Sequence, residues 1–244
     1  MKRTYTFKNL TLYPGNQKAC TAAYDLVESG KPADNPLYIY GRTGLGKTHI
    51  LQAVRQQVTE NHPNSSITFM TCEKFCSELS RFEFMVEYQR YSGDLPDFFI
   101  LDNVQEVTAD KSAPQILADL VKVLYNRNRK IILAADIPLY RLQTLFRSQE
   151  NGPVIHCKRI DPPNLPERIL LCWDKCKELG IYFPDEIIWA IAADCDGSIC
   201  SMEGALTTIS TYGKLMKTEI DLSVCEMILK RFKNWKNFKK MDRL

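Results

Sequence analysis

The feature that most constrains the fold of this chain is a glycine-rich turn directly behind a short apolar run. The run is "PLYIY" at 36–40, and the turn is "GRTGLGKTH" at 41–49. Its first eight residues match G-x-x-x-x-G-K-[S/T], in which main-chain N–H groups and the start of a helix surround phosphate oxygens. The turn is followed by apolar residues at helical spacing within 50–58. We therefore expect a strand, a phosphate-binding loop and a helix, in that order.

The residue types in this turn predict a bound nucleotide, ATP or ADP, together with Mg²⁺. Glycines keep side chains away from the phosphates. Lys47 is expected to reach the β- and γ-phosphates, and Thr48 to ligate Mg²⁺ through its hydroxyl group. The candidate cofactor-binding residues are Gly41, Thr43, Gly44, Leu45, Gly46, Lys47, Thr48 and His49.

Two further apolar runs end in a polar residue, as strands of a parallel sheet do, and in both that residue is an aspartate. "DFFILD" ends at Asp102, which is the second candidate ligand for Mg²⁺, and "KIILAAD" ends at Asp136. The residue after Asp102 is Asn103, which can orient a water molecule but cannot take its proton at neutral pH. For Asp136 two interpretations stay open: it senses the γ-phosphate, or it caps the turn that follows. Asp102, Asn103 and Asp136 are the candidate catalytic residues.

The order of these patterns predicts two folded regions. Apolar runs alternate with helical patterns up to about residue 160, with weaker strand candidates at 66–71 and 153–160, which is typical of an α/β sheet covered on both faces. Asn164, with Glu167 three positions later, then predicts the capped start of a helix. Beyond it only helical patterns are found, at 165–179, 184–194, 198–216 and 221–229. We expect an α/β nucleotide-binding domain at 1–160, a small helical domain at 161–229 and a basic aromatic tail at 230–244.

Composition narrows the remaining classes. No apolar run is long enough to span a membrane and no signal-peptide core follows the basic N-terminus, so a cytoplasmic location is expected. The nine cysteines include no C-x-x-C pair, which favours small buried side chains over a zinc site. The tail carries seven Lys/Arg and one Asp, and its rings Phe232, Trp235 and Phe238 alternate with lysines. Three interpretations stay open for the tail: docking on the helical domain, contact with nucleic acid, or contact with a membrane surface, although no stable membrane association is expected.

Taken in order, these motifs resemble the AAA+ domain of the DnaA family of bacterial replication initiators. Segment 5–54 resembles the start of that domain, "ILDNVQEV" its Walker B segment and "IILAADIPL" its sensor 1 strand. "LFRSQ" is similar to the arginine-finger box, "IDPPNLPERILL" to the entry of the lid, and "DGSICSMEGAL" to the sensor 2 helix. The resemblance covers about residues 4 to 229. It implies a P-loop AAA+ domain, a three-layer parallel-sheet α/β fold, followed by a small helical lid domain.

The departures from the family pattern bear on activity. Gln149 stands at the position of the finger arginine, with Arg147 two residues before it, and Cys200 stands at the position of the sensor 2 arginine. A finger arginine is worth about 10³ to 10⁵ in turnover. No further interaction domain or origin-binding helix-turn-helix domain is recognised in the sequence.

The chain therefore resembles the shortened, stand-alone relatives typified by Hda, although their clamp-binding motif and finger arginine are not recognised. The resemblance implies an ATP- or ADP-binding regulator of bacterial chromosome replication initiation with weak or absent hydrolysis. Its expected partner is a DnaA-type initiator, or further copies of itself, through AAA+ contacts. The alternatives are an active AAA+ ATPase of the helicase-loader or DNA-remodelling type that holds DNA through residues 230–244, and a pocket that keeps ADP as a structural ligand.

Overall fold

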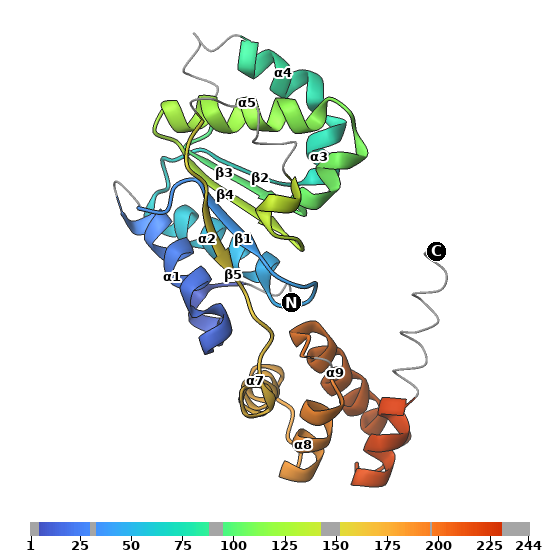
Figure 1. Ribbon diagram of the computed structural model, residues 1–244. Coiled ribbons are helices and arrows are strands. Elements are labelled where there is room, and N and C mark those ends of the chain that lie inside the picture. Colours follow the sequence, from blue (N-terminus) through green and yellow to red (C-terminus); the bar gives the residue numbers. More distant parts are fainter. Residues whose placement is uncertain (1–4, 30–32, 88–94, 143–151, 196, 231–244) are drawn as a thin grey trace. The chain divides into compact units, whose positions relative to one another are not determined.

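A computed structural model describes residues 5–29, 33–87, 95–142, 152–195 and 197–230 (Figure 1). The chain divides into two compact units between Asp161 and Pro162.

The first unit is built on a five-stranded sheet in which every strand pair is parallel. The strand order is β2-β3-β4-β1-β5, so that β1 lies between β4 and β5. All five apolar runs form strands, and the fifth is shorter than the expected 153–160. The strands are β1 (Leu37–Tyr40), β2 (Ile67–Thr71), β3 (Phe98–Asp102), β4 (Lys130–Ala135) and β5 (His156–Arg159).

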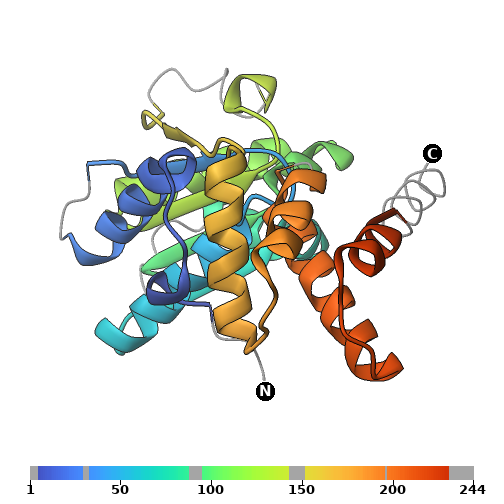
Figure 2. The same cartoon turned by 90° about the horizontal axis from the view of Figure 1, so that it is seen from below.

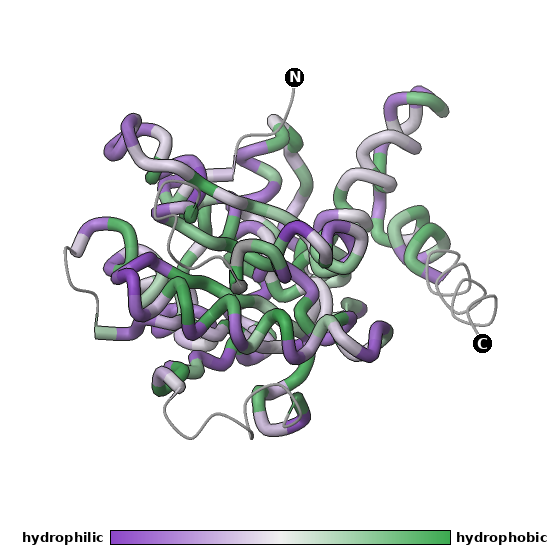
Figure 3. The backbone as a smooth tube through the Cα atoms, turned by 90° about the horizontal axis from the view of Figure 1, so that it is seen from above, coloured by the Kyte–Doolittle hydropathy of each residue, from purple (hydrophilic) through white to green (hydrophobic). Residues whose placement is uncertain are grey.

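Helices cover both faces of this sheet, which confirms the three-layer α/β fold (Figure 1). Leu37 and Ile39 of β1 belong to one apolar cluster with residues of α1 and α2. Tyr38, which lies between them, belongs to a second cluster with residues of α3, α4 and α5. This alternation follows from the two-residue repeat of a strand. The helices that cover the sheet are amphipathic, and Figure 3 shows hydrophilic and hydrophobic residues alternating along them. The helices are α1 (Pro14–Glu28), α2 (Lys47–Asn61), α3 (Cys72–Ser77), α4 (Leu79–Glu87) and α5 (Ala113–Asn126), with short 3₁₀ turns η1 (Phe7–Asn9), η2 (Val104–Ala109) and η3 (Leu139–Leu142).

The last residue of the first unit is fixed against the start of α1. The main-chain N–H of Asp161 donates to the carbonyl oxygen of Gly15 at 3.0 Å. The Tyr13 hydroxyl donates to the carbonyl oxygen of Asp161, also at 3.0 Å. A Cβ atom on Gly15 would lie 2.6 Å from that same oxygen, so the close approach of these two backbone segments requires glycine.

Helices are the regular secondary structure of the second unit over its described residues, and short irregular segments join them (Figure 2). Its helices are α7 (Leu165–Leu179), α8 (Asp185–Asp194), α9 (Ile199–Met216) and a helix at 222–230. The predicted capping box of α7 is confirmed: the Asn164 side chain accepts from the N–H of Glu167 at 3.0 Å, and the Glu167 carboxylate accepts from the N–H of Asn164 at 2.8 Å. Arg168 joins α7 to α8 by donating to the carbonyl oxygen of Ala192 at 2.7 Å.

Most of the cysteines pack as small apolar side chains. Burial raises the pKa of the thiols of Cys20 and Cys172 to about 12, so both stay protonated at neutral pH. Cys157 and Cys200 are exposed and Cys76 is half-buried. The buried ones are Cys20, Cys72, Cys172, Cys176, Cys195 and Cys225. Among the described residues, no helix combines the length and apolar character needed to cross a membrane.

Candidate functional site

The glycine-rich turn joins the carboxyl end of β1 to the start of α2. Gly44 and Gly46 have φ angles of 82° and 89°, which side chains disfavour, and Gly46 caps the amino end of α2. Leu45 lies between them with only 3% of its surface exposed, inside the apolar cluster of α1 and α2. The Leu45 side chain therefore anchors the loop, and its main chain remains available on the other side.

Lys47 is a buried cation that is held by oxygen atoms from two segments of the chain. Its side chain is 6% exposed, and its Nζ donates to the carbonyl oxygens of Gly41 at 2.7 Å and Arg42 at 3.1 Å. Nζ also lies 2.6 Å from Oδ1 of Asp136. The second oxygen of Asp136 accepts from the Thr43 hydroxyl at 2.6 Å. Both carboxylate oxygens of Asp136 therefore bond residues of the phosphate loop, and a sensing role toward the γ-phosphate stays a prediction.

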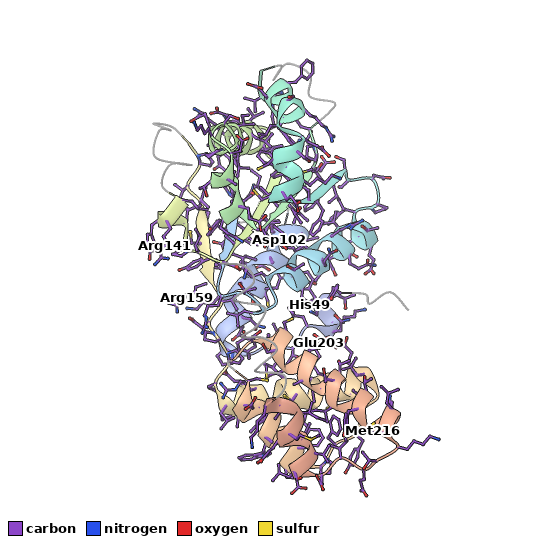
Figure 4. All side chains as sticks on the ribbon, turned by 90° about the vertical axis from the view of Figure 1, so that its right-hand side faces the viewer. His49, Asp102, Arg141, Arg159, Glu203 and Met216 are labelled. Atoms are coloured by element: carbon purple, nitrogen blue, oxygen red, sulfur yellow. The ribbon has the colours of Figure 1, made fainter. Side chains whose placement is uncertain are left out.

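Thr48 and Asp102 come together on the other side of the loop. The Thr48 hydroxyl donates to Oδ2 of Asp102 at 2.6 Å. Asp102 is 3% exposed at the carboxyl end of β3, and its Oδ1 accepts from the main-chain N–H of Asn103 at 2.9 Å. Figure 4 labels Asp102 together with His49, which lies in the first turn of α2. The sheet thus unites three segments that are distant in sequence: the phosphate loop, the end of β3 and the end of β4.

Asn103 has a left-handed backbone, with φ 59° and ψ 41°. Among residues other than glycine, Asn and Asp tolerate this conformation best. The backbone at this position therefore accepts either an amide or a carboxylate side chain. An asparagine in place of an acid at position 103 removes a proton acceptor and leaves the conformation of the turn unchanged.

Gln105 is a residue of the site that sequence reasoning missed. It lies in η2, and its Oε1 accepts from the main-chain N–H of Asp136 at 3.0 Å. The nearby Tyr38 hydroxyl donates to the carbonyl oxygen of Ile137 at 2.7 Å, and burial raises the pKa of Tyr38, so that it remains a donor. Gln105 lies within "ILDNVQEV", but the motif assigns no role to it, and its only signal is its place three residues after Asp102.

His49 points toward the N-terminal segment. Its Nε2 lies 3.1 Å from Oδ1 of Asn9 and 3.3 Å from the carbonyl oxygen of Thr6, and its ring meets that of Tyr5 edge-on at 4.8 Å between centroids. His49 therefore ties α2 to residues 5–9. A direct contact between His49 and a nucleotide stays a prediction.

Other predicted positions fall elsewhere. Cys200 is exposed in the first turn of α9. Arg147, Gln149 and the tail residues 231–244 lie outside the described residues.

This fold and this site define a P-loop domain of the AAA+ class, in which a parallel sheet carries the phosphate loop and a helical unit follows. Residues 1–150 match the family described as the bacterial DnaA ATPase domain. The chain belongs to this family.

Individual relatives agree with this assignment. The chromosomal replication initiator protein DnaA of Nautilia profundicola is 34% identical over 233 residues, which are 93% of this chain and 52% of that protein. The chain thus spans about half the length of this relative. Domain III of the Thermotoga maritima replication initiation protein DnaA is 25% identical, with a TM-score of 0.81 over 95% of this chain and 98% of that structure.

A further solved structure is Aquifex aeolicus DnaA bound to AMPPCP, which is 22% identical with a TM-score of 0.69. The match covers 87% of this chain and 66% of the Aquifex aeolicus chain. At this level of identity the match concerns the fold alone.

Proposed function

We propose that this chain binds ATP or ADP with Mg²⁺ at residues 41–49 and acts, like Hda, as a regulator of bacterial replication initiation that hydrolyses its nucleotide weakly or not at all. The observation that carries the proposal is the pairing of an intact phosphate loop with Asn103 beside Asp102. The loop is built for phosphate, whereas the residue that follows Asp102 cannot accept a proton from water.

The nucleotide fits the loop for three reasons. The positive φ angles of Gly44 and Gly46 give the main chain the shape that presents N–H groups to phosphate oxygens. The amino end of α2 adds the positive end of its dipole. Lys47 supplies a buried positive charge that now pairs with Asp136 and two carbonyl oxygens. In support, a DnaA relative with the same fold has been solved with the nucleotide analogue AMPPCP.

Mg²⁺ fits the pair formed by Thr48 and Asp102. Both supply oxygen atoms, which this ion prefers, and the two oxygens already lie 2.6 Å apart. Bound Mg²⁺ neutralises part of the charge on the phosphate oxygens. Thr48 and Asp102 would hold it, with Lys47 on the phosphate side, while the side-chain amide of Asn103 would orient water.

The weak-hydrolysis part of the proposal is tested by single-turnover cleavage of radiolabelled ATP bound to the full chain. The native protein is expected to retain intact ATP for hours. Asn103→Asp restores a carboxylate in the same left-handed turn and is expected to cleave ATP at least ~10-fold faster, since a positioned base contributes about 10²–10⁴. Asn128→Asp is the matched control, because Asn128 is exposed and also has a positive φ, 56°.

Two results would overturn the proposal. Cleavage by the native protein within minutes would refute weak hydrolysis. Failure to retain any nucleotide, with or without Mg²⁺, would refute the binding site itself.

The proposed partner is a DnaA-type initiator or a second copy of the chain. Family membership and the AAA+ fold support this choice. Analytical ultracentrifugation of the full chain with a purified DnaA-type initiator is expected to show a complex that depends on the bound nucleotide. Sedimentation of the two proteins as separate species at micromolar concentrations, with ATP and with ADP, would contradict the proposed partner.

A second candidate function is DNA binding through the tail. Residues 230–244 carry a net charge of +6, whereas the whole chain carries +3, so the other 229 residues carry −3. Binding through lysines on phosphates is expected to weaken steeply with salt. Replacing Lys233, Lys236, Lys239 and Lys240 by alanine is expected to abolish binding to single-stranded DNA, and equal binding by this variant would refute the candidate.

A further inference from the structure

The main-chain N–H of Asp136 donates its hydrogen bond to a side chain. Asp136 follows β4 directly, one residue beyond the last ladder pair of β4 with β1, which joins Tyr40 to Ala135. The acceptor is Oε1 of Gln105, at 3.0 Å. The side chain of Asp136 is 30% exposed, so burial alone does not fix its position. Its position depends on this contact and on the bonds of its carboxylate.

Gln105 is itself held by the turn that presents Asp102. Asn103 is fixed by its N–H bond to Asp102, and the N–H of Glu106 closes the turn by donating to the carbonyl oxygen of Asn103 at 2.9 Å. On either side of Gln105, Val104 and Val107 are fully buried in the apolar cluster of α3, α4 and α5. The amide of Gln105 is therefore presented by a rigid segment.

These contacts close a ring that starts and ends on the phosphate loop. Thr48 bonds Asp102, the chain runs from Asp102 to Gln105, Gln105 bonds Asp136, and Asp136 bonds Lys47 and Thr43. The ring therefore connects the pair on the metal side of the loop to the residue that faces the phosphate-side cation.

We propose that Gln105 is a positioning residue that holds the carboxylate of Asp136 on Lys47 and Thr43, and thereby sets how strongly the loop prefers ATP over ADP. This inference rests on the proposed nucleotide site. A carboxylate that is held on Lys47 and Thr43 stays off the γ-phosphate. When the anchor is lost, the backbone of Asp136 can shift, and its carboxylate, then held only by Lys47 and Thr43, can move closer to the γ-phosphate, which repels it; ADP has no such group.

The test compares Gln105→Met, which keeps the length of the side chain and removes the acceptor, with Gln115→Met as matched control. Gln115 is an exposed glutamine of α5 that bonds Asp119 within the same helix. Equilibrium dialysis with radiolabelled ATP and ADP gives both dissociation constants for the full chain. Gln105→Met is expected to lower the ratio of ATP affinity to ADP affinity by about fivefold, the size expected for one hydrogen bond, with ADP binding within about twofold of the native value. The control is expected to leave both constants unchanged.

Hydrogen exchange without nucleotide tests the positioning separately. The amide of Asp136 is expected to exchange faster in Gln105→Met. In Gln105→Glu, which retains an oxygen at the same place, it is expected to exchange at the native rate. An unchanged ATP-to-ADP ratio in Gln105→Met, or an equal loss of both affinities, overturns the inference. If the native protein binds neither nucleotide while exchange at Asp136 responds as expected, the nucleotide site is wrong and the positioning role of Gln105 stands.

Discussion

The ion pair between Lys47 and Asp136 makes a quantitative prediction about the nucleotide-free protein. Lys47 is 6% exposed and contacts three oxygens, of which the carboxylate of Asp136 carries the only full charge. Lys47→Met removes the cation and leaves that carboxylate and two carbonyl oxygens without it. Removal of one partner of a buried pair costs about 3–5 kcal/mol. Because Asp136 is 30% exposed and keeps its bond from Thr43, we expect a lower cost, about 2–3 kcal/mol.

A double-mutant cycle isolates the pair itself. The free energy of unfolding is measured for the native chain, Lys47→Met, Asp136→Asn and the double variant, by urea titration followed with circular dichroism in the absence of nucleotide. A coupling energy of about 1–2 kcal/mol is expected, below the gross attraction of about 4 kcal/mol for unit charges near a protein surface because part of it offsets desolvation. The control is a cycle on Lys74 and Glu78, a pair 3.8 Å apart at the end of α3 in which the cation is 61% exposed, unlike the buried Lys47, and for which about 0.3–0.5 kcal/mol is expected. A coupling at Lys47 and Asp136 no larger than that of the control would refute the reasoning.

Three further outcomes follow from the packing and charge of both units. Gly15→Ala places a Cβ atom 2.6 Å from the carbonyl oxygen of Asp161 and is expected to destabilise the protein by about 2 kcal/mol, so a melting temperature equal to the native one would contradict the close approach. Asn164→Ala removes the capping box of α7 and is expected to cost about 1 kcal/mol in urea unfolding, whereas a cost near zero would show that the cap is not formed in solution. Burial acts to raise the pKa of Asp97, but hydrogen bonds from Ser66 and the charge of Arg129 outweigh it and hold this pKa below its ordinary value. A carboxylate whose pKa is lowered in the folded state stabilises the fold at pH values above its unfolded pKa of about 3.9, and this stabilisation is lost as the pH falls below that value. The difference in stability between the native chain and Asp97→Asn, measured by thermal unfolding, is therefore expected to narrow below about pH 4. A difference that stays constant with pH would contradict the direction of the pKa shift.

Much of this architecture is predictable from local patterns. The apolar runs that end in Asp102 and Asp136 identify central strands because a strand buried on both faces has no polar alternation to confuse the assignment. The start of α7 is equally local, since Asn164 and Glu167 satisfy each other within one turn. The fifth strand is shorter than its pattern because only residues 156–159 pair in register with β1, which is four residues long.

The contacts that define the site are not local. The contacts of Asp136 depend on where Lys47 and Thr43 lie, about 90 positions earlier in the chain, and only the assembled sheet brings these residues together. Gln105 is similar, because a single glutamine between buried valines carries no pattern that indicates which main-chain N–H it will meet. The left-handed backbone of Asn103 is also invisible in the sequence, although it explains why this position holds Asn and would accept Asp.

The anchoring of Asp161 on Tyr13 and Gly15 limits the torsional freedom of the chain between the two units. The first unit ends at a residue whose N–H and C=O are both bonded, and the capping box of α7 begins only three residues later, at Asn164. The two residues between them are Pro162 and Pro163, whose rings fix φ near −65°. Within residues 161–164, the backbone torsions left unrestrained by these bonds and rings are therefore few, chiefly ψ of the two prolines, which makes this segment a short and stiff stretch of chain.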